Sequence, residues 1–262
     1  MPASIRQPID QKVLIEPLTP VAFAPFGTVI QNPAKARFPS PLSSIEANQG
    51  SATKYSDVSP LVSSYSSARS AKPASPKVSM FSCRPRALRR TPHGQQFFNV
   101  KILERHPFTP QTFIPTGLAA DDRDTAYLVI VAPTLSLAHD VALEEEFHDA
   151  HRSPTLVQRL LGSTPIPSSM SPTARPKPHG LPDLANIRAF VARGDQAVTY
   201  GAGTWHAPMV VLGKQTIDFV VLQYANGVGA EDCQEIELRD GNLDVVVEED
   251  LVARHESQIA KL

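Results

Sequence analysis

The segment Phe98-Asn-Val-Lys-Ile-Leu103 sets the expected fold class, and Glu104-Arg-His-Pro107 follows it directly. Apolar and polar residues alternate along this segment, so that Phe98, Val100 and Ile102 share one side of an extended chain. Alternation with a period of two is typical of a β-strand that buries one face. We therefore expect a half-buried strand that ends in titratable side chains.

Short apolar runs of strand length recur before and after this segment. They cover residues 13–15, 28–30, 78–82, 112–115, 126–132, 197–200, 209–212, 216–224, 235–239 and 243–247. Turn-forming residues separate the runs at short intervals, a spacing that is typical of antiparallel sandwiches and barrels. The 262 residues are enough to bury one good core, and we expect one domain over residues 1–262.

Outside residues 136–182, two segments are expected to be helical. Thr19 is a favourable N-cap in front of Pro20, which suits the first position of a helix, and Gly27 is expected to end this single turn. Residues 183–194 form the clearest helix prediction, with Asp183 as the N-cap and a glycine at the end. The apolar stripe of this helix consists of Leu184, Ile187, Phe190 and Val191.

Two long segments break the β pattern. Residues 32–77 are rich in Pro, Ser and Ala, a composition that favours loops, and within them Asn48-Gln49-Gly50 is expected to form a tight turn. Residues 136–182 contain an acidic stretch at 144–146, a predicted short helix at 156–161 and a Pro/Ser-rich tail. We interpret residues 136–182 as an insertion, either a lid over the barrel or a plain surface excursion.

The composition excludes several classes of protein. The 25 Lys and Arg residues against 26 Asp and Glu residues give a net charge of −1, without the clustered basic surface of a nucleic-acid-binding domain. No apolar run reaches the ~20 residues that span a bilayer, and the N-terminus lacks the apolar stretch of a secretory signal. Cys83 and Cys233 form neither a metal-spaced pair nor a disulfide framework, so we expect reduced thiols and a cytoplasmic location.

Four arginines form the main local concentration of positive charge: Arg84, Arg86, Arg89 and Arg90. A solvated loop and a site for a ligand carboxylate both explain them. A polyanion is not expected as the ligand, because no second basic cluster extends this surface.

Glu104 and His106 stand two residues apart at the end of the predicted strand, so their side chains are expected to point the same way. Gln111 follows after a Pro-containing turn, and a hairpin here would return it toward the pair. This spacing resembles the first metal motif of the cupin superfamily, with Glu104 and Gln111 in the first and third ligand positions. Cupins are double-sheet jelly rolls. The resemblance therefore implies a cupin-like antiparallel β-barrel with a few short helices.

Gly201-Ala-Gly203, followed by Thr204-Trp-His206, resembles the second cupin motif. The glycines would provide the turn that points His206 into the same cavity as the first motif. One interpretation is a divalent metal site, although the neutral Gln111 removes a charged ligand from it. A second is a metal-free pocket that moves protons, and a third is that the histidines are core residues beside a salt-bridged strand end. The metal interpretation would use Glu104, His106, Gln111 and His206.

Read with the rest of the chain, these motifs resemble the ureidoglycolate lyase family. The matching segments are residues 16–30, 103–115, 182–190, 198–209 and 216–219, together with the turn at 48–50 and the residues at 54–55. There are two departures: Ala207 stands where the family commonly has a second His, and the arginine after the strand near Phe81 comes only at Arg84. The length of residues 136–182 indicates a eukaryotic, fungal branch.

The resemblance implies cleavage of (S)-ureidoglycolate to glyoxylate and urea, late in allantoin breakdown, by a homodimer. Elimination needs a base for the hydroxyl proton and an acid for the leaving urea nitrogen, and a histidine can take either role. We expect His106 and His206 in these roles, in an order left open, with Glu104 orienting or sharing the proton. The residues expected to bind the substrate are Gln111, Tyr200, Trp205, Asp218, Asn48 and Arg84.

Two alternatives remain open for the function. A hydrolase acting on the same substrate would release ammonia, whereas the lyase releases intact urea. A non-catalytic cupin-like protein that binds a small acid would need the pocket but no acid/base pair. The measured products distinguish the lyase from the hydrolase. Turnover by a protein without the two histidines distinguishes the enzyme from the binding protein.

Overall fold

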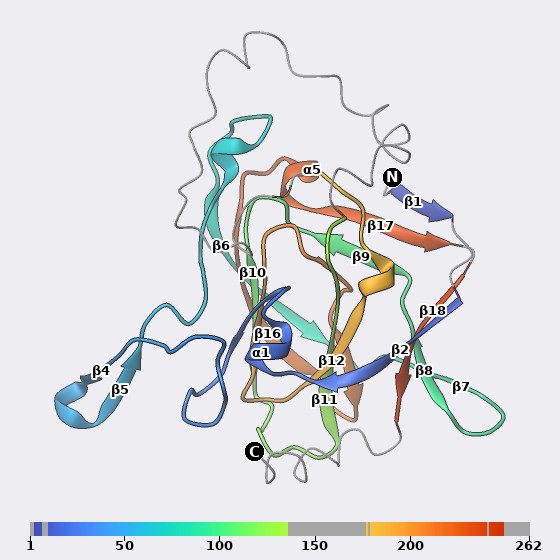
Figure 1. The fold of residues 1–262 in the computed structure, drawn as a ribbon, viewed down its shortest axis with the longest axis horizontal. Helices are drawn as coiled ribbons and strands as arrows, with labels where there is room; N and C mark the ends of the chain where they lie inside the picture. Colours follow the sequence, from blue (N-terminus) through green and yellow to red (C-terminus); the bar gives the residue numbers. More distant parts are fainter. Residues whose placement is uncertain (1–2, 7–9, 136–176, 178, 240, 249–262) are drawn as a thin grey trace.

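The computed structural model describes residues 3–6, 10–135, 177, 179–239 and 241–248, and β-strands dominate their fold (Figure 1). Within these residues the strands form an 11-stranded sheet, a 5-stranded sheet and a separate two-stranded hairpin. The larger sheet curls around one apolar core and packs one of its faces against the smaller sheet through a second core. The expected cupin-like β architecture is confirmed.

The larger sheet has the strand order β1-β17-β9-β14-β11-β12-β2-β18-β8-β7, and β15 also pairs with β11. Its strands are β1 (Ala3–Arg6), β2 (Asp10–Pro17), β7 (Arg89–Arg90), β8 (Gln96–Asn99), β9 (Ile102–Arg105), β11 (Thr125–Ala132), β12 (Arg188–Ala192), β14 (Trp205–His206), β15 (Val210–Gly213), β17 (Gln234–Arg239) and β18 (Asn242–Val247). The smaller sheet has the order β3-β13-β10-β16-β6. Its strands are β3 (Gly27–Ile30), β6 (Ser75–Cys83), β10 (Gln111–Thr116), β13 (Ala197–Tyr200) and β16 (Ile217–Ala225).

The hairpin and the helical turns complete the described elements. They are β4 (Ser44–Ala47), β5 (Ala52–Tyr55), the α-helical turns α1 (Pro20–Phe23) and α5 (Gly229–Asp232), and the 3-10 turns η1 (Asn48–Gly50), η2 (Tyr65–Ser67) and η4 (Leu184–Asn186). The turn predicted after Thr19 is confirmed as α1, because the Thr19 hydroxyl accepts the backbone N–H of Ala22 at 3.1 Å. The turn predicted at residues 48–50 is confirmed as η1.

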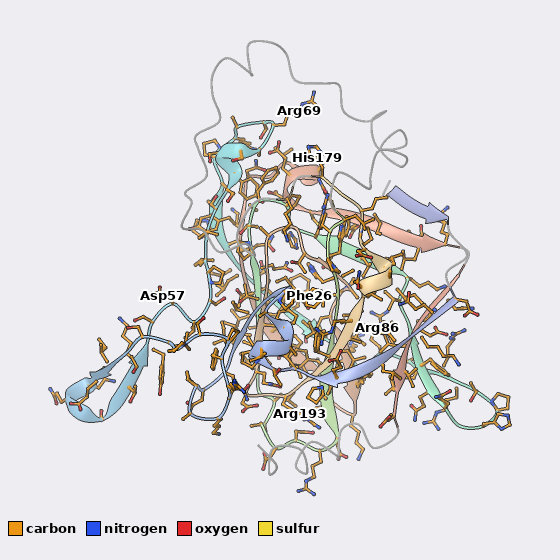
Figure 2. All side chains as sticks on the ribbon, in the orientation of Figure 1. Phe26, Asp57, Arg69, Arg86, His179 and Arg193 are labelled. Carbon is orange, nitrogen blue, oxygen red and sulfur yellow. The ribbon has the colours of Figure 1, made fainter. Side chains whose placement is uncertain are left out.

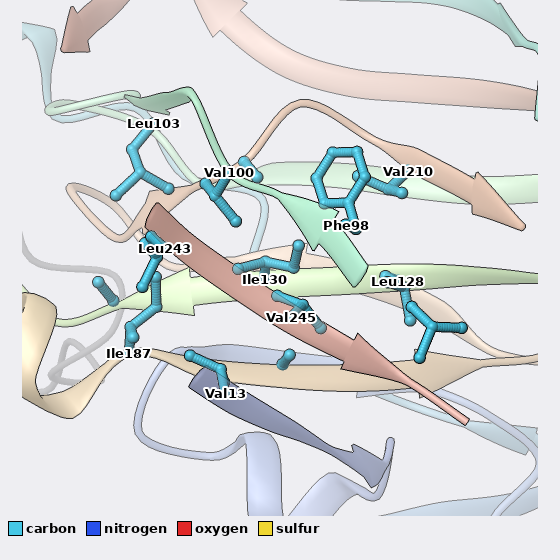
Figure 3. Close-up of a cluster of buried hydrophobic side chains, with 14 of the residues drawn as sticks. Val13, Phe98, Val100, Leu103, Leu128, Ile130, Ile187, Val210, Leu243 and Val245 are labelled. Carbon is cyan, nitrogen blue, oxygen red and sulfur yellow. The ribbon is translucent and has the colours of Figure 1, made fainter. Parts of the chain in front are cut away.

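Strand β11 separates the two cores. Its residues are buried on both faces, which explains why its sequence is a continuous apolar run rather than an alternating one. Leu128 and Ile130 point into the core inside the curl of the larger sheet, with the residues labelled in Figure 3. Tyr127 and Val129 point the other way, into the core between the two sheets.

The strand runs predicted from the sequence all overlap observed strands, but the pairing is mixed rather than purely antiparallel. The smaller sheet is antiparallel throughout its described pairs. In the larger sheet, β2 pairs in parallel with both β12 and β18, and β1 pairs in parallel with β17. Parallel neighbours need long crossover connections, and no local sequence pattern reports which distant strand will be the neighbour.

The predicted helix at residues 183–194 is wrong. Only Leu184–Asn186 form a helical turn, and Arg188–Ala192 form strand β12 between β11 and β2. Phe190 packs into the core between the sheets, whereas Val191 packs into the other core. A strand buried on both faces places apolar residues at consecutive positions, and here that run fits helical spacing as well.

The predicted continuous strand at residues 98–103 is also wrong in detail. The chain leaves β8 after Asn99, and the Val100 N–H donates to the Leu243 carbonyl before β9 begins at Ile102. The break shifts the alternation, so that Leu103 is fully buried and Ile102 is 40% exposed. Ile102 therefore does not share the buried side of Phe98.

The β4–β5 hairpin projects from the body of the molecule (Figure 1). Asp57, which follows β5, lies outside the barrel at the root of this hairpin (Figure 2). The predicted lid or excursion at 136–182 and the predicted helix at 156–161 lie outside the described residues, apart from the end of the segment. Among the described residues no helix is long and apolar enough to cross a membrane. The expected cytoplasmic location stays a prediction.

Candidate active site

Glu104 and His206 come together because their strands pair. Strand β14 lies between β9 and β11, with His206 directly opposite Glu104 on one side and Val131 on the other. Directly opposed residues of an antiparallel pair point to the same face. Since Val131 belongs to the core between the sheets, Glu104 and His206 face that interior.

His106 completes the group. The His206 Nε2 atom lies 3.5 Å from the Glu104 Oε1 atom, and the ring centroids of His106 and His206 are 5.7 Å apart. One ligand atom from each of the three residues lies within 4.8 Å of the others. The two predicted motifs therefore meet, and we call Glu104, His106 and His206 the catalytic cluster.

Backbone carbonyls hold both imidazole rings. The His106 Nδ1 atom is 2.6 Å from the Asp232 carbonyl, and the His206 Nδ1 atom is 3.0 Å from the Thr204 carbonyl. A carbonyl can only accept, so each Nδ1 carries a proton, and in a neutral ring of this tautomer the Nε2 atom is an acceptor.

The loop before His206 is anchored by the segment between α1 and β3. The Phe26 carbonyl accepts the Gly201 N–H at 2.8 Å and the Thr204 hydroxyl at 3.0 Å. Figure 2 places Phe26 near the centre of the molecule. The Tyr200 ring stacks on His206, with centroids 3.9 Å apart and planes 8° apart. His206 is therefore fixed on one face by an aromatic ring and at its Nδ1 atom by the main chain.

Burial and the neighbouring charges set the protonation of the cluster. Burial and the charge of His206 lower the pKa of His106 from 6.5 to about 4, despite the Asp232 carbonyl and Glu104, which act in the opposite direction. Burial also acts to raise the pKa of Glu104, but the nearby His206, 3.5 Å away, and the charge of His106 outweigh it and lower the pKa below its ordinary value. At neutral pH the site therefore holds a neutral His106 beside an ionised Glu104.

The donor set fits a divalent metal ion. In the described part of the chain, the buried side-chain nitrogens and oxygens that lack a hydrogen-bond partner are His106 Nε2, His206 Nε2 and Gln111 Oε1. Imidazole nitrogens with a carboxylate suit several first-row divalent metals. Glu104, His106 and His206 could therefore hold a metal ion.

Gln111 reaches the site by a different route from the predicted hairpin. Strand β10 does not pair with β9, because the chain crosses from the larger sheet to the smaller one between them. Gln111 opens β10, opposite Tyr200, and its amide donates to Gln223 Oε1 at 2.6 Å. This bond leaves the Gln111 oxygen for a ligand, and the side chain lies close enough to His106 to affect the pKa of that residue.

The structure does not bring Trp205 or Asp218 to the catalytic cluster. Trp205 points away from it into the core inside the larger sheet, because successive residues of β14 face opposite sides. Asp218 is exposed and lies on the opposite face of β16 from Gln223, five residues along that strand.

Asn48 and Arg84 also lie away from the cluster. Asn48 is exposed in the turn of the projecting hairpin (Figure 1). Arg84 follows β6 and is exposed, seven residues beyond Lys77, the position that pairs with Gln223. Seven residues of extended strand correspond to roughly 23 Å. The residue types at positions 48 and 84 do not indicate how far these side chains lie from the cluster.

Sequence reasoning missed Asp232, which orients His106, because its backbone carbonyl does this work and a carbonyl has no sequence signature. It also missed Gln223, which the alternation of side chains along β16 could have indicated.

Cys233 and Glu235 form a second group with Glu104, with ligand atoms within 4.8 Å of one another. Burial and the charge of Glu104 raise the pKa of Cys233 to about 12, so its thiol is protonated at neutral pH.

The sequence is similar to known proteins over most of its length. The family model described as ureidoglycolate lyase matches residues 10–246. A ureidoglycolate lyase of Schizosaccharomyces pombe is 32% identical over 224 residues, which cover 86% of this chain and 90% of that protein. One from Saccharomyces cerevisiae is 33% identical over 153 residues (57% of this chain, 55% of that protein), and one from Burkholderia mallei is 29% identical over 208 residues (79% of each).

Proposed function

The chain belongs to the ureidoglycolate lyase family, and on this premise we propose that it cleaves (S)-ureidoglycolate to glyoxylate and urea. The observation that carries the proposal is the meeting of Glu104, His106 and His206 in one group between the two sheets. Two histidines with distinct partners provide the separate acid and base that this elimination needs.

The reaction moves one proton from oxygen to nitrogen. The central carbon of ureidoglycolate carries a hydroxyl, a carboxylate and the ureido nitrogen. A base removes the hydroxyl proton, the C–O bond becomes the aldehyde of glyoxylate, and the C–N bond breaks as an acid protonates the departing nitrogen. Water is neither consumed nor released.

The two histidines differ in the partner of their Nε2 atoms. The His206 Nε2 atom faces Glu104 at 3.5 Å, an arrangement that accommodates a proton between them and suits the acid. The neutral His106 has a proton on Nδ1 and a bare Nε2 atom, which suits the base. Gln111 is proposed to bind the carboxylate or ureido group, and Tyr200 to support the His206 ring.

A divalent ion held by Glu104, His106 and His206, with Gln111 as a fourth ligand, would supply a Lewis acid for the substrate oxygens. The chain's residues would then orient the substrate rather than carry its protons. Chelator treatment distinguishes these two roles of the same side chains.

The test is incubation of the purified protein with racemic ureidoglycolate, with and without chelator. Glyoxylate, urea and ammonia are assayed separately. Urea and glyoxylate in equal amounts are expected, with half of the racemate consumed. Ammonia in place of urea would indicate a hydrolase, and no glyoxylate at all would refute the proposed function.

The double substitution His106→Ala/His206→Ala tests the site. It is expected to abolish turnover while ureidoglycolate still binds. His93→Ala is the matched control, because His93 is exposed in the loop before β8. Full turnover by the double variant would show that the site is elsewhere.

We also propose a homodimer. Among the strands of the described residues, β6 is at the edge of the smaller sheet, and its exposed apolar side chains include Val78 and Met80. An unpaired edge with exposed apolar residues favours association with another chain. Light scattering after size exclusion should give twice the 28.4 kDa chain mass, and a single chain mass at micromolar concentration would refute the dimer.

A further inference from the structure

The hydrogen bond that orients His106 comes from a very short element. Its acceptor, the Asp232 carbonyl, belongs to α5, a single turn of four residues. One helical turn is not stable by itself. The position of this carbonyl, and with it the proton on His106 Nδ1, therefore depends on what holds α5 in place.

The Asp232 carboxylate ties α5 to two other segments. Its Oδ1 atom accepts the Tyr65 hydroxyl at 2.8 Å and the Asn226 N–H at 2.8 Å, and its Oδ2 atom accepts the Gly227 N–H at 2.7 Å. The neighbouring Glu231 carboxylate accepts the Ser70 N–H at 2.7 Å. The side chain of Asp232 thus anchors the residue whose carbonyl holds His106.

Tyr65 is the best buried residue of this arrangement. It lies in η2, is 2% exposed and packs against Phe108, two residues from His106, with ring centroids 5.6 Å apart. Its hydroxyl is also 3.2 Å from the Tyr224 carbonyl. A phenol has one proton, and the shorter contact, to the Asp232 carboxylate, is the stronger because its acceptor is charged.

We propose that Tyr65 and Asp232 are positioning residues of the active site, which hold the carbonyl that keeps the His106 proton on Nδ1 and leaves Nε2 bare. Among the described residues, neither side chain hydrogen-bonds to Glu104, His106 or His206, and both act through the main chain of α5. The role in catalysis rests on the proposed lyase function, whereas the role in fixing the tautomer does not. Outer residues that orient a histidine in this way typically contribute 10–100-fold to metal affinity or activity.

Tyr65→Phe removes only the hydroxyl. Its matched control is Tyr127→Phe, because Tyr127 is also fully buried and its hydroxyl donates to the Gln196 carbonyl, away from the site. The first measurement is the ¹⁵N spectrum of the imidazole nitrogens without substrate, with the His106 signals assigned by their loss in His106→Gln. Wild type and Tyr127→Phe should show the proton on Nδ1, and Tyr65→Phe should show a mixture of tautomers.

The second measurement is steady-state kinetics with ureidoglycolate. Tyr65→Phe should lower kcat about 10-fold, with KM changed less than twofold, and Tyr127→Phe should leave both unchanged. Asp232→Asn keeps the oxygen that Tyr65 and Asn226 share, so it should retain more activity than Asp232→Ala.

The outcomes separate the two proposals. A wild-type His106 protonated on Nε2, an unchanged spectrum and kcat in Tyr65→Phe, or equal losses in Tyr65→Phe and Tyr127→Phe would each overturn the positioning role. If wild type shows no turnover, the lyase function is refuted, and the spectra still decide whether Tyr65 fixes the tautomer.

Discussion

Replacing His106 with glutamine should make the stability of the protein less sensitive to acid. The pKa of this histidine is lowered from 6.5 to about 4 in the folded protein. Between these values the unfolded chain binds a proton that the folded chain does not. The free energy of unfolding therefore falls as the pH drops from about 6.5 to about 4. Above this range the histidine is neutral in both states and does not lower the stability.

The magnitude follows from the two pKa values. A group with a pKa of 6.5 in the unfolded chain and about 4 in the folded one lowers the free energy of unfolding by about 2 kcal/mol between pH 7 and pH 5. Because the pKa of Glu104 is lowered from 4.5, that carboxylate is largely ionised at both pH values and adds little to the difference.

The assay is urea denaturation of chelator-dialysed protein at pH 7 and pH 5. His106→Gln should lose about 2 kcal/mol less than wild type over this interval. His93→Gln removes an exposed histidine and should lose as much as wild type. If His106→Gln and wild type lose the same free energy within about 0.5 kcal/mol, the histidine is not buried as a neutral ring and the electrostatic description of the site is wrong.

Two further predictions concern the scaffold and are checked by the same denaturation assay at pH 7. Gly27→Ala should cost about 2 kcal/mol or more, because the added Cβ would lie 1.9 Å from the Thr199 carbonyl across the β3–β13 pair. Gly229→Ala is its control, since no atom of the described residues lies within 4 Å of the added Cβ, and similar losses in both variants would contradict this explanation. Thr19→Ala should cost about 1 kcal/mol through the lost cap on Ala22, and an unchanged urea midpoint would show that α1 is held by packing alone.

Much of the catalytic cluster could be predicted because the relevant rules are local. Glu104 and His106 share a side because they stand two residues apart in an extended chain. The turn before His206 could be recognised from its own glycines, which is also a local signal. The rules failed where the chain changes its partner. The alternation from Phe98 to Leu103 breaks when pairing passes from β18 to β17, which no residue in that segment announces.

Several residues predicted to bind the substrate lie away from the catalytic cluster for a related reason. Trp205 has the right type and is adjacent to His206, but adjacency in a strand places it on the opposite face. Asp218 stands five residues from Gln223 in β16, so the same alternation places it on the opposite face of the strand. Asn48 belongs to the turn at residues 48–50, which the local sequence predicts correctly. Its position on a projecting hairpin depends on the path of the whole segment around it, which local sequence does not determine.

The residues alone established that the chain forms many short strands, that a Glu-x-His pair ends one of them and that another histidine follows a glycine turn, because period and turn chemistry act over a few neighbouring positions. The pairing of β9 with β14, which sets Glu104 opposite His206, arose only in the folded chain. So did the hydrogen bond from His106 to the carbonyl of Asp232, 126 positions away. Both depend on contacts between distant segments, and the backbone groups that make them are the same in every residue.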